Sequence, residues 1–179
     1  MKIPLDPDVA GAVRFQEYGP AKAIEGVVHR PLKKHRSLDG WFLEHLRVTG
    51  GKVEGLPVPF EVRQISLSRA TPGRINAFHV HPRRVQDEIW CVVEGALQVW
   101  LADVRETSAT RGARRPYLLS AEEPALLLIP SGVAHGYKAG PKGALLLYAM
   151  NSQFDTADPN EGRLPWDHFG LELWAEDRG

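Results

Sequence analysis

The sequence of 179 residues contains a single cysteine, Cys91, so no disulfide can form within one chain and a reducing compartment is expected. It has no run of about twenty apolar residues, the length that a membrane-spanning helix needs. Net positive charge is absent as well, because 22 Lys and Arg residues balance 22 Asp and Glu residues, which argues against binding to a phosphate backbone. We therefore expect a cytoplasmic protein that binds neither nucleic acid nor membrane.

Short β-rich runs dominate the sequence from about residue 40 onward. Glycine, proline or charged residues separate them, and no long amphipathic helix is evident. The runs cover residues 41–48, 60–69, 75–81, 88–93, 96–101, 125–129 and 144–150. Glu94 and Gly95, between the fourth and fifth runs, predict a hairpin turn. The spacing indicates an all-β barrel or sandwich, and the length suits one domain.

The chain divides into three parts by composition. Residues 1–36 are rich in proline, glycine and basic residues, and we expect an N-terminal arm there. Residues 37–155 hold the β-rich runs and are expected to form the barrel. Residues 156–179 are expected to be an irregular tail whose aromatic residues cover the barrel; these are Trp166, Phe169 and Trp174.

Four side chains of metal-ligand type are spaced so that strand pairing can bring them together. His79 and His81 are two residues apart in a predicted strand, so their imidazoles share a face. Glu88 opens the next run, and His135 follows a Pro-x-Gly turn. Alternatively, each histidine is an ordinary core or surface residue, but four such groups buried without partners would be costly. We predict that all four bind one divalent transition metal, namely iron, manganese, nickel, zinc or copper.

Two motifs in the sequence resemble those of the cupins. A glycine, five residues, His-x-His, six residues, Glu, six residues and Gly span 73–95, and "IPSGVAH" at 129–135 matches Pro-x-Gly-x-x-His. The resemblance implies a cupin jelly-roll β-barrel with its site in the mouth. Residues 37–166 are also similar, through "DGWFLE", "FHVH", "IPSGVAHGY" and "EGRLPW", to the dTDP-4-dehydrorhamnose 3,5-epimerases.

This resemblance implies an isomerase or epimerase that acts on a keto sugar or sugar nucleotide through an enolate. In that family the histidine matching His79 removes a proton next to the ketone, and the tyrosine matching Tyr148 returns one on the opposite face. The family forms homodimers by exchanging N-terminal strands. The N-terminal arm, residues 1–36, would be the exchanged segment here. Candidate substrate contacts are Gln64 and Arg74, from strand alternation, and Asn76, which stands where the family has a diphosphate-binding arginine.

Departures from the family pattern concern the site itself. The family has a glutamine at the position of His81 and, beside the substrate carbonyl, a lysine at that of Glu88, so both changes create a metal ligand. A histidine whose lone pair binds a metal cannot also take a proton, so His79 acts as a base only if no metal is bound to it. The family's aspartate that orients this base lies in a C-terminal segment with no evident equivalent here, and we expect no such partner for His79.

Two other functions stay open from the sequence. An iron-dependent dioxygenase would take up oxygen with iron(II), and a non-catalytic sugar-binding cupin would be stabilised by its ligand without turnover. An epimerase in which a bound metal replaces the lysine as the cation that stabilises the enolate is favoured, because the resemblance is long and collinear.

Overall fold

In the computed structural model, which describes residues 3–15 and 22–176, antiparallel β-strands make up almost all of the regular structure. The elements are α1 (Pro7–Ala10), β1 (Val28–Pro31), β2 (Lys34–Arg36), β3 (Trp41–Leu43), β4 (Val48–Thr49), β5 (Lys52–Val53), β6 (Gln64–Ala70), β7 (Ile75–Val80), β8 (Glu88–Asp103), β9 (Arg114–Ser120), β10 (Ala125–Ile129), β11 (Val133–Met150), β12 (Gly162–Arg163) and the 3₁₀ helix η1 (Leu171–Trp174). The predicted all-β, cupin jelly-roll barrel is confirmed.

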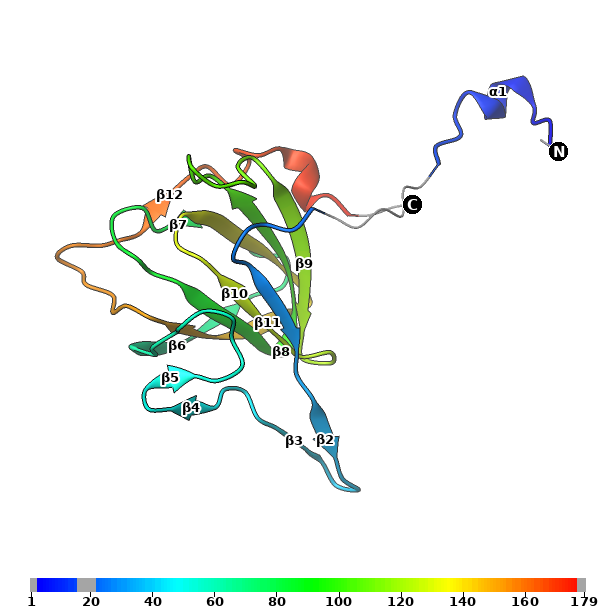
Figure 1. Ribbon diagram of the computed structural model, residues 1–179. Helices are drawn as coiled ribbons and strands as arrows, with labels where there is room; N and C mark the ends of the chain where they lie inside the picture. The colour runs from blue at the N-terminus through cyan, green and yellow to red at the C-terminus, as the bar shows by residue number, and fades with distance from the viewer. Residues whose placement is uncertain (1–2, 16–21, 177–179) are drawn as a thin grey trace.

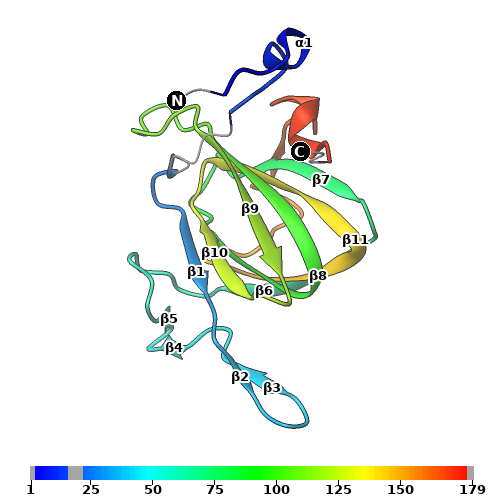
Figure 2. The same ribbon diagram turned by 90° about the vertical axis from the view of Figure 1, so that its right-hand side faces the viewer.

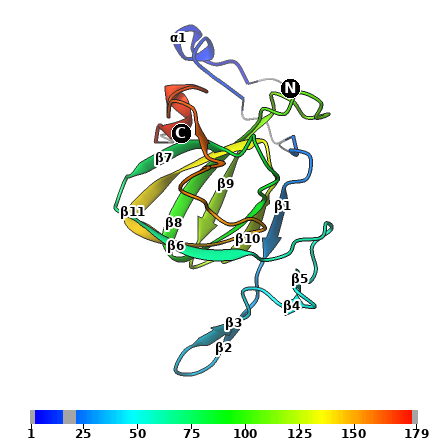
Figure 3. The same ribbon diagram turned by 90° about the vertical axis from the view of Figure 1, so that its left-hand side faces the viewer.

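Two long strands, β8 and β11, pair with each other along most of their length and organise the barrel. Strands β10 and β9 pair in turn with the other edge of β8, and β7 and β6 with the other edge of β11. β1 extends the sheet beside β10, and β12 extends it beside β7. The sheet curls around an open end, which the segment between β11 and β12 crosses (Figures 1 and 3).

The predicted hairpin at Glu94 and Gly95 is wrong, because β8 runs through both residues without turning back. Gly95 has φ +69°, and a Cβ added there would lie 2.0 Å from the carbonyl oxygen of Gly143 on β11. The register between β8 and β11 also shifts next to this position. The glycine therefore lets β8 bend and pass close to β11. Glycine favours such bends as well as turns, so its presence alone does not predict a hairpin.

Apolar side chains from β8, β9, β10 and β11 fill the barrel, with Leu97, Leu119 and Leu127 fully buried. A separate cluster joins the barrel to the tail. Phe78 of β7 packs edge-on against Phe169, with ring centroids 4.9 Å apart, and also contacts Trp174. These contacts hold the C-terminal tail against β7.

The N-terminal region contributes to the sheet and also extends away from it. β1 pairs with β10, whereas the β2–β3 hairpin projects from the barrel (Figures 1 and 2). Trp41 and Phe42 of this hairpin are exposed. The proposed exchange of residues 1–36 in a homodimer stays a prediction, and residues 1–2 and 16–21 of that arm lie outside the described ranges. Within those ranges, no helix is long and apolar enough to cross a membrane.

Candidate functional site

A cavity of about 280 Å³ lies in the mouth of the barrel. All the predicted site residues except Arg74 line it: Gln64, Asn76, His79, His81, Glu88, His135 and Tyr148. Arg74 is exposed in the turn before β7, where strand alternation does not direct its side chain. Residues far apart in the sequence therefore meet in one chamber, as expected for a catalytic or binding site.

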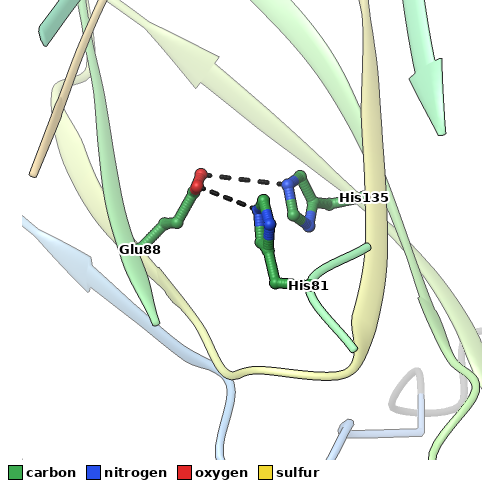
Figure 4. Close-up of side chains that lie close together, drawn as sticks. All are labelled: His81, Glu88 and His135. Atoms are coloured by element: carbon green, nitrogen blue, oxygen red, sulfur yellow. Dashed lines mark ion pairs between the residues drawn. The ribbon is translucent and has the colours of Figure 1, made fainter. Parts of the chain in front are cut away.

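Three of the four predicted metal ligands, all of which line this cavity, come close together (Figure 4). Nε2 of His81 lies 3.0 Å from Oε1 of Glu88, and Nε2 of His135 lies 3.8 Å from Oε2 of the same carboxylate. His81 follows β7, Glu88 begins β8, and His135 lies near the start of β11. All three side chains are buried.

The outer nitrogen of each imidazole in this cluster faces a backbone carbonyl. Nδ1 of His81 lies 2.7 Å from the carbonyl oxygen of Asn160, and Nδ1 of His135 lies 2.9 Å from that of Val133. Because a carbonyl only accepts hydrogen bonds, both Nδ1 atoms carry a proton, and the lone pair of a neutral ring is then on Nε2, toward Glu88. This donor set fits a transition metal of the kind predicted.

Two further residues, which the sequence did not single out, hold the Glu88 carboxylate. Trp90 Nε1 donates to its Oε2 at 2.7 Å, and Gln86 Nε2 donates to its Oε1 at 3.1 Å. Burial alone would raise the pKa of Glu88, but the hydrogen bond with His81 and the charges of the nearby histidines lower it to about 2. Burial also lowers the pKa of His81, but the hydrogen bond with Glu88 and the charge of that carboxylate act in the opposite direction, and the pKa is raised overall.

His79 lies beside this cluster but faces different partners. Its Nδ1 is 3.3 Å from Oε1 of Glu161, and its Nε2 is 3.0 Å from Oδ1 of Asn76. Arg163 pairs with the same Glu161 oxygen at 2.6 Å. The expectation that His79 has no carboxylate partner is therefore wrong. The partner lies in "EGRLPW", a segment already noted for its family resemblance, whose pairing with β7 only the fold reveals.

The pKa of His79 is lowered to about 4, chiefly by burial and further by the nearby His135 and Arg163, although Glu161 acts in the opposite direction. His79 is thus neutral near pH 7 and able to accept a proton. The His135 ring lies near both other histidines, with centroids 5.9 Å from His79 and 5.3 Å from His81.

An irregularity in β7 explains why Asn76 and His79 line the same cavity although three positions separate them. His79 pairs with His135 on β11, but Asn76 pairs with Tyr137, so the register shifts between the two pairs. β7 has one residue more than β11 across this interval. Such a bulge reverses the usual alternation of faces, which sequence patterns do not reveal.

Tyr148 and Gln64 lie on the paired strands β11 and β6. Burial raises the pKa of Tyr148 more than a hydrogen bond with Ser66 lowers it, so the phenol keeps its proton at neutral pH. Gln64 donates to Ser66 at 3.0 Å and accepts from the backbone nitrogen of Phe154 at 2.9 Å. The cavity thus holds a neutral imidazole and a protonated phenol.

The sequence model of the dTDP-4-dehydrorhamnose 3,5-epimerase family matches residues 21–175 of this chain. The chain belongs to this family. The spore coat polysaccharide biosynthesis protein SpsL of Bacillus subtilis is 38% identical over 145 residues, covering 80% of this chain and 91% of the relative. The resemblance identified from the motifs is thereby confirmed.

Solved structures of dTDP-sugar epimerases and isomerases share the fold. The epimerase of Legionella pneumophila, solved with dTDP-4-keto-L-rhamnose, has a TM-score of 0.73 at 22% identity and covers 88% of this chain and 80% of that one. The dTDP sugar isomerase of Desulfovibrio desulfuricans has a TM-score of 0.70 at 24% identity, with coverages of 86% and 91%. At such identities the likeness establishes the architecture, and the site must be argued from its own residues.

Proposed function

We propose that this protein epimerises a carbon next to the ketone of a 4-keto sugar nucleotide, with His79 as the base and Tyr148 as the acid. The observation that carries the proposal is the 3.3 Å approach of Glu161 to Nδ1 of His79, in the cavity that Tyr148 also lines. Membership of the dTDP-4-dehydrorhamnose 3,5-epimerase family supports the substrate class.

In this proposal Glu161 keeps a proton on Nδ1 of His79, so that Nε2 presents its lone pair to the substrate. A carboxylate beside the outer nitrogen also stabilises the imidazolium that forms when the carbon proton arrives. Asn76, whose amide oxygen lies 3.0 Å from Nε2, accepts a hydrogen bond when that nitrogen carries a proton, so it would turn aside or bond to the substrate instead. The electron pair left by the proton moves to the ketone oxygen and gives an enolate.

Tyr148 would complete the inversion by giving its phenol proton to the opposite face of the enolate. Its raised pKa keeps that proton in place at neutral pH. A cavity of about 280 Å³ suits a sugar ring and is at the small end of ligand sites, so we expect the nucleotide to lie toward the mouth and beyond it.

The test is exchange of solvent deuterium into a dTDP-4-keto-6-deoxy sugar. The wild-type protein in D2O is expected to add deuterium at a carbon beside the ketone, detected by mass spectrometry and located by NMR, and to form an epimer. His79→Asn is expected to abolish both, because the amide cannot take the proton. Absence of exchange with nucleotide-linked keto sugars would falsify the proposal.

A further inference from the structure

We propose that His81, Glu88 and His135 bind one divalent transition-metal ion, and that His79 stays outside its ligand set. The four-ligand prediction is thereby replaced by a three-ligand centre with a separate base beside it. Binding of the ion does not depend on the function proposed above, whereas the catalytic role assigned to it below does.

The separations of the donor atoms support one shared ion. Ligand atoms around a single ion lie roughly 3 to 3.5 Å apart, because each bond is about 2.1 Å long. Oε1 of Glu88 lies 3.0 Å from Nε2 of His81, and Oε2 of Glu88 lies 3.8 Å from Nε2 of His135. With one donor atom taken from each residue, the three atoms lie within 4.8 Å of one another. Small rotations of the side chains would bring them around one centre, and Gln86 would then give up its hydrogen bond to Glu88.

The orientation of the rings supports a cation more strongly than the distances do. Both Nδ1 protons are held by backbone carbonyls, those of Asn160 and Val133, so both Nε2 lone pairs turn toward the Glu88 carboxylate. The amide nitrogen of Gln86 lies 3.3 Å from Nε2 of His81 and 3.1 Å from Oε1 of Glu88, whereas Nε2 of His135 faces the other carboxylate oxygen, Oε2, at 3.8 Å. A cation between the three groups would satisfy all three electron-pair donors at once. Histidines that bind metals are oriented by outer hydrogen bonds of this kind.

A proton is the alternative to a metal, but one proton serves only part of the cluster. Protonated His81 would donate to Glu88 at 3.0 Å, whereas His135 would still turn its lone pair toward the other carboxylate oxygen. A second proton would bury two cations against one carboxylate. One divalent ion, by contrast, can accept all three lone pairs at once.

Two imidazole nitrogens and one carboxylate oxygen suit zinc, iron(II), manganese, cobalt or nickel better than calcium or magnesium. Three protein ligands leave positions for a substrate oxygen. Glu88 stands where the family resemblance implies a lysine beside the substrate carbonyl, so the ion would supply the positive charge at the ketone oxygen. His79 lies outside this ligand set, since its nitrogens face Asn76 and Glu161, and it would keep the role of base.

Metal content and binding test the site without any assay of activity. We expect the full-length protein, purified without added metal, to contain close to one transition-metal ion per chain, as measured by inductively coupled plasma mass spectrometry. Titration of the chelator-treated protein with Co²⁺ should give saturable visible absorption bands at one equivalent. Glu88→Gln and His81→Ala should weaken Co²⁺ binding by more than about 100-fold, beyond what loss of an outer-shell partner costs.

The matched control is His79→Asn, which changes a neighbouring histidine of the same cavity and should leave Co²⁺ affinity within a few-fold of wild type. Should Glu88→Gln or His81→Ala fail to fold, the Co²⁺ spectrum and metal-induced thermal stabilisation of the wild type still test whether the site binds a metal.

Sub-stoichiometric metal content with no Co²⁺ spectrum would overturn the proposed metal centre. Equal losses in His79→Asn and Glu88→Gln overturn the three-ligand assignment. Metal binding without deuterium exchange would contradict only the proposed epimerase function. Deuterium exchange by a protein that binds no metal would contradict only the metal centre.

Discussion

Oε1 of Glu161 lies 3.3 Å from Nδ1 of His79, so the carboxylate partner of this histidine comes from the segment between β11 and β12 rather than from the long strands of the barrel. Strand β12, which begins one residue later, pairs with β7 and fixes this approach, since Arg163 lies opposite His79. Arg163 also binds the carboxylate and limits its motion. The geometry and charge of the site therefore depend on a short strand in the C-terminal region.

Glu161→Gln should lower kcat/KM for deuterium exchange by about 100-fold, because the imidazolium formed on His79 loses its counter-charge. Initial rates of exchange into the keto sugar nucleotide measure the effect. Glu94→Gln is the control, since Glu94 pairs with Arg69 on the surface and should leave the rate unchanged. An equal rate in Glu161→Gln and wild type would remove Glu161 from the mechanism.

The pH profile should reflect the low pKa of His79, about 4. A base works in its neutral form, and a lowered pKa keeps it neutral further into the acid range. kcat/KM should therefore stay flat from pH 8 to about 5 and fall tenfold per pH unit below about 4. Because Glu161 raises the pKa of His79, Glu161→Gln should move the midpoint still lower. A midpoint at or above the ordinary histidine value, with folding checked by circular dichroism, contradicts this account.

Tyr148→Phe should separate proton removal from inversion. His79 would still remove the proton and could return it to the same face, so exchange should persist while formation of the epimer falls by about 100-fold or more. NMR of the product sugar distinguishes the two outcomes. Tyr117→Phe is the control, because Tyr117 is buried in the barrel core away from the cavity lining. Unchanged epimer formation in Tyr148→Phe would assign the acid elsewhere.

Gly95→Ala should destabilise the protein by about 3 kcal/mol, because a positive φ and an overlap with a backbone oxygen both oppose the new methyl group. Gly73 offers a matched control. It has a similar φ, +70°, but open space around the added carbon, so Gly73→Ala should cost only about 1 kcal/mol. Urea denaturation followed by tryptophan fluorescence measures both, and equal losses would show that the contact with Gly143 does not matter.

The architecture and most of the cavity follow from local patterns in the sequence. Short alternating runs predict a β-barrel, and the His-x-His pair with the later Glu and His brings His81, Glu88 and His135 together once the strands pair. Gly95 misled the prediction, because glycine marks a turn and a bent strand equally well and only the partner strand decides between them. The same holds for β7, whose bulge depends on its pairing with β11.

Glu161 illustrates the other limit of sequence reasoning. The family resemblance marks its segment, "EGRLPW", but nothing in the local sequence shows that its carboxylate lies beside His79, because that depends on where the segment after β11 folds back. Aromatic packing of Phe169 and Trp174 against Phe78 holds the following residues to β7. That placement depends on tertiary packing, so the sequence alone does not predict that Glu161 lies beside His79.

The imidazole of His135 lies close to both other histidines of the cavity, with ring centroids 5.9 Å from His79 and 5.3 Å from His81. Its outer nitrogen faces the carbonyl oxygen of Val133, two residues earlier in the same strand. Turning the ring would therefore break a contact that β11 itself supplies. A substitution that shifts the start of β11 should affect the surroundings of His79 and His81 together, so effects of mutations in this pocket are expected to be coupled rather than additive.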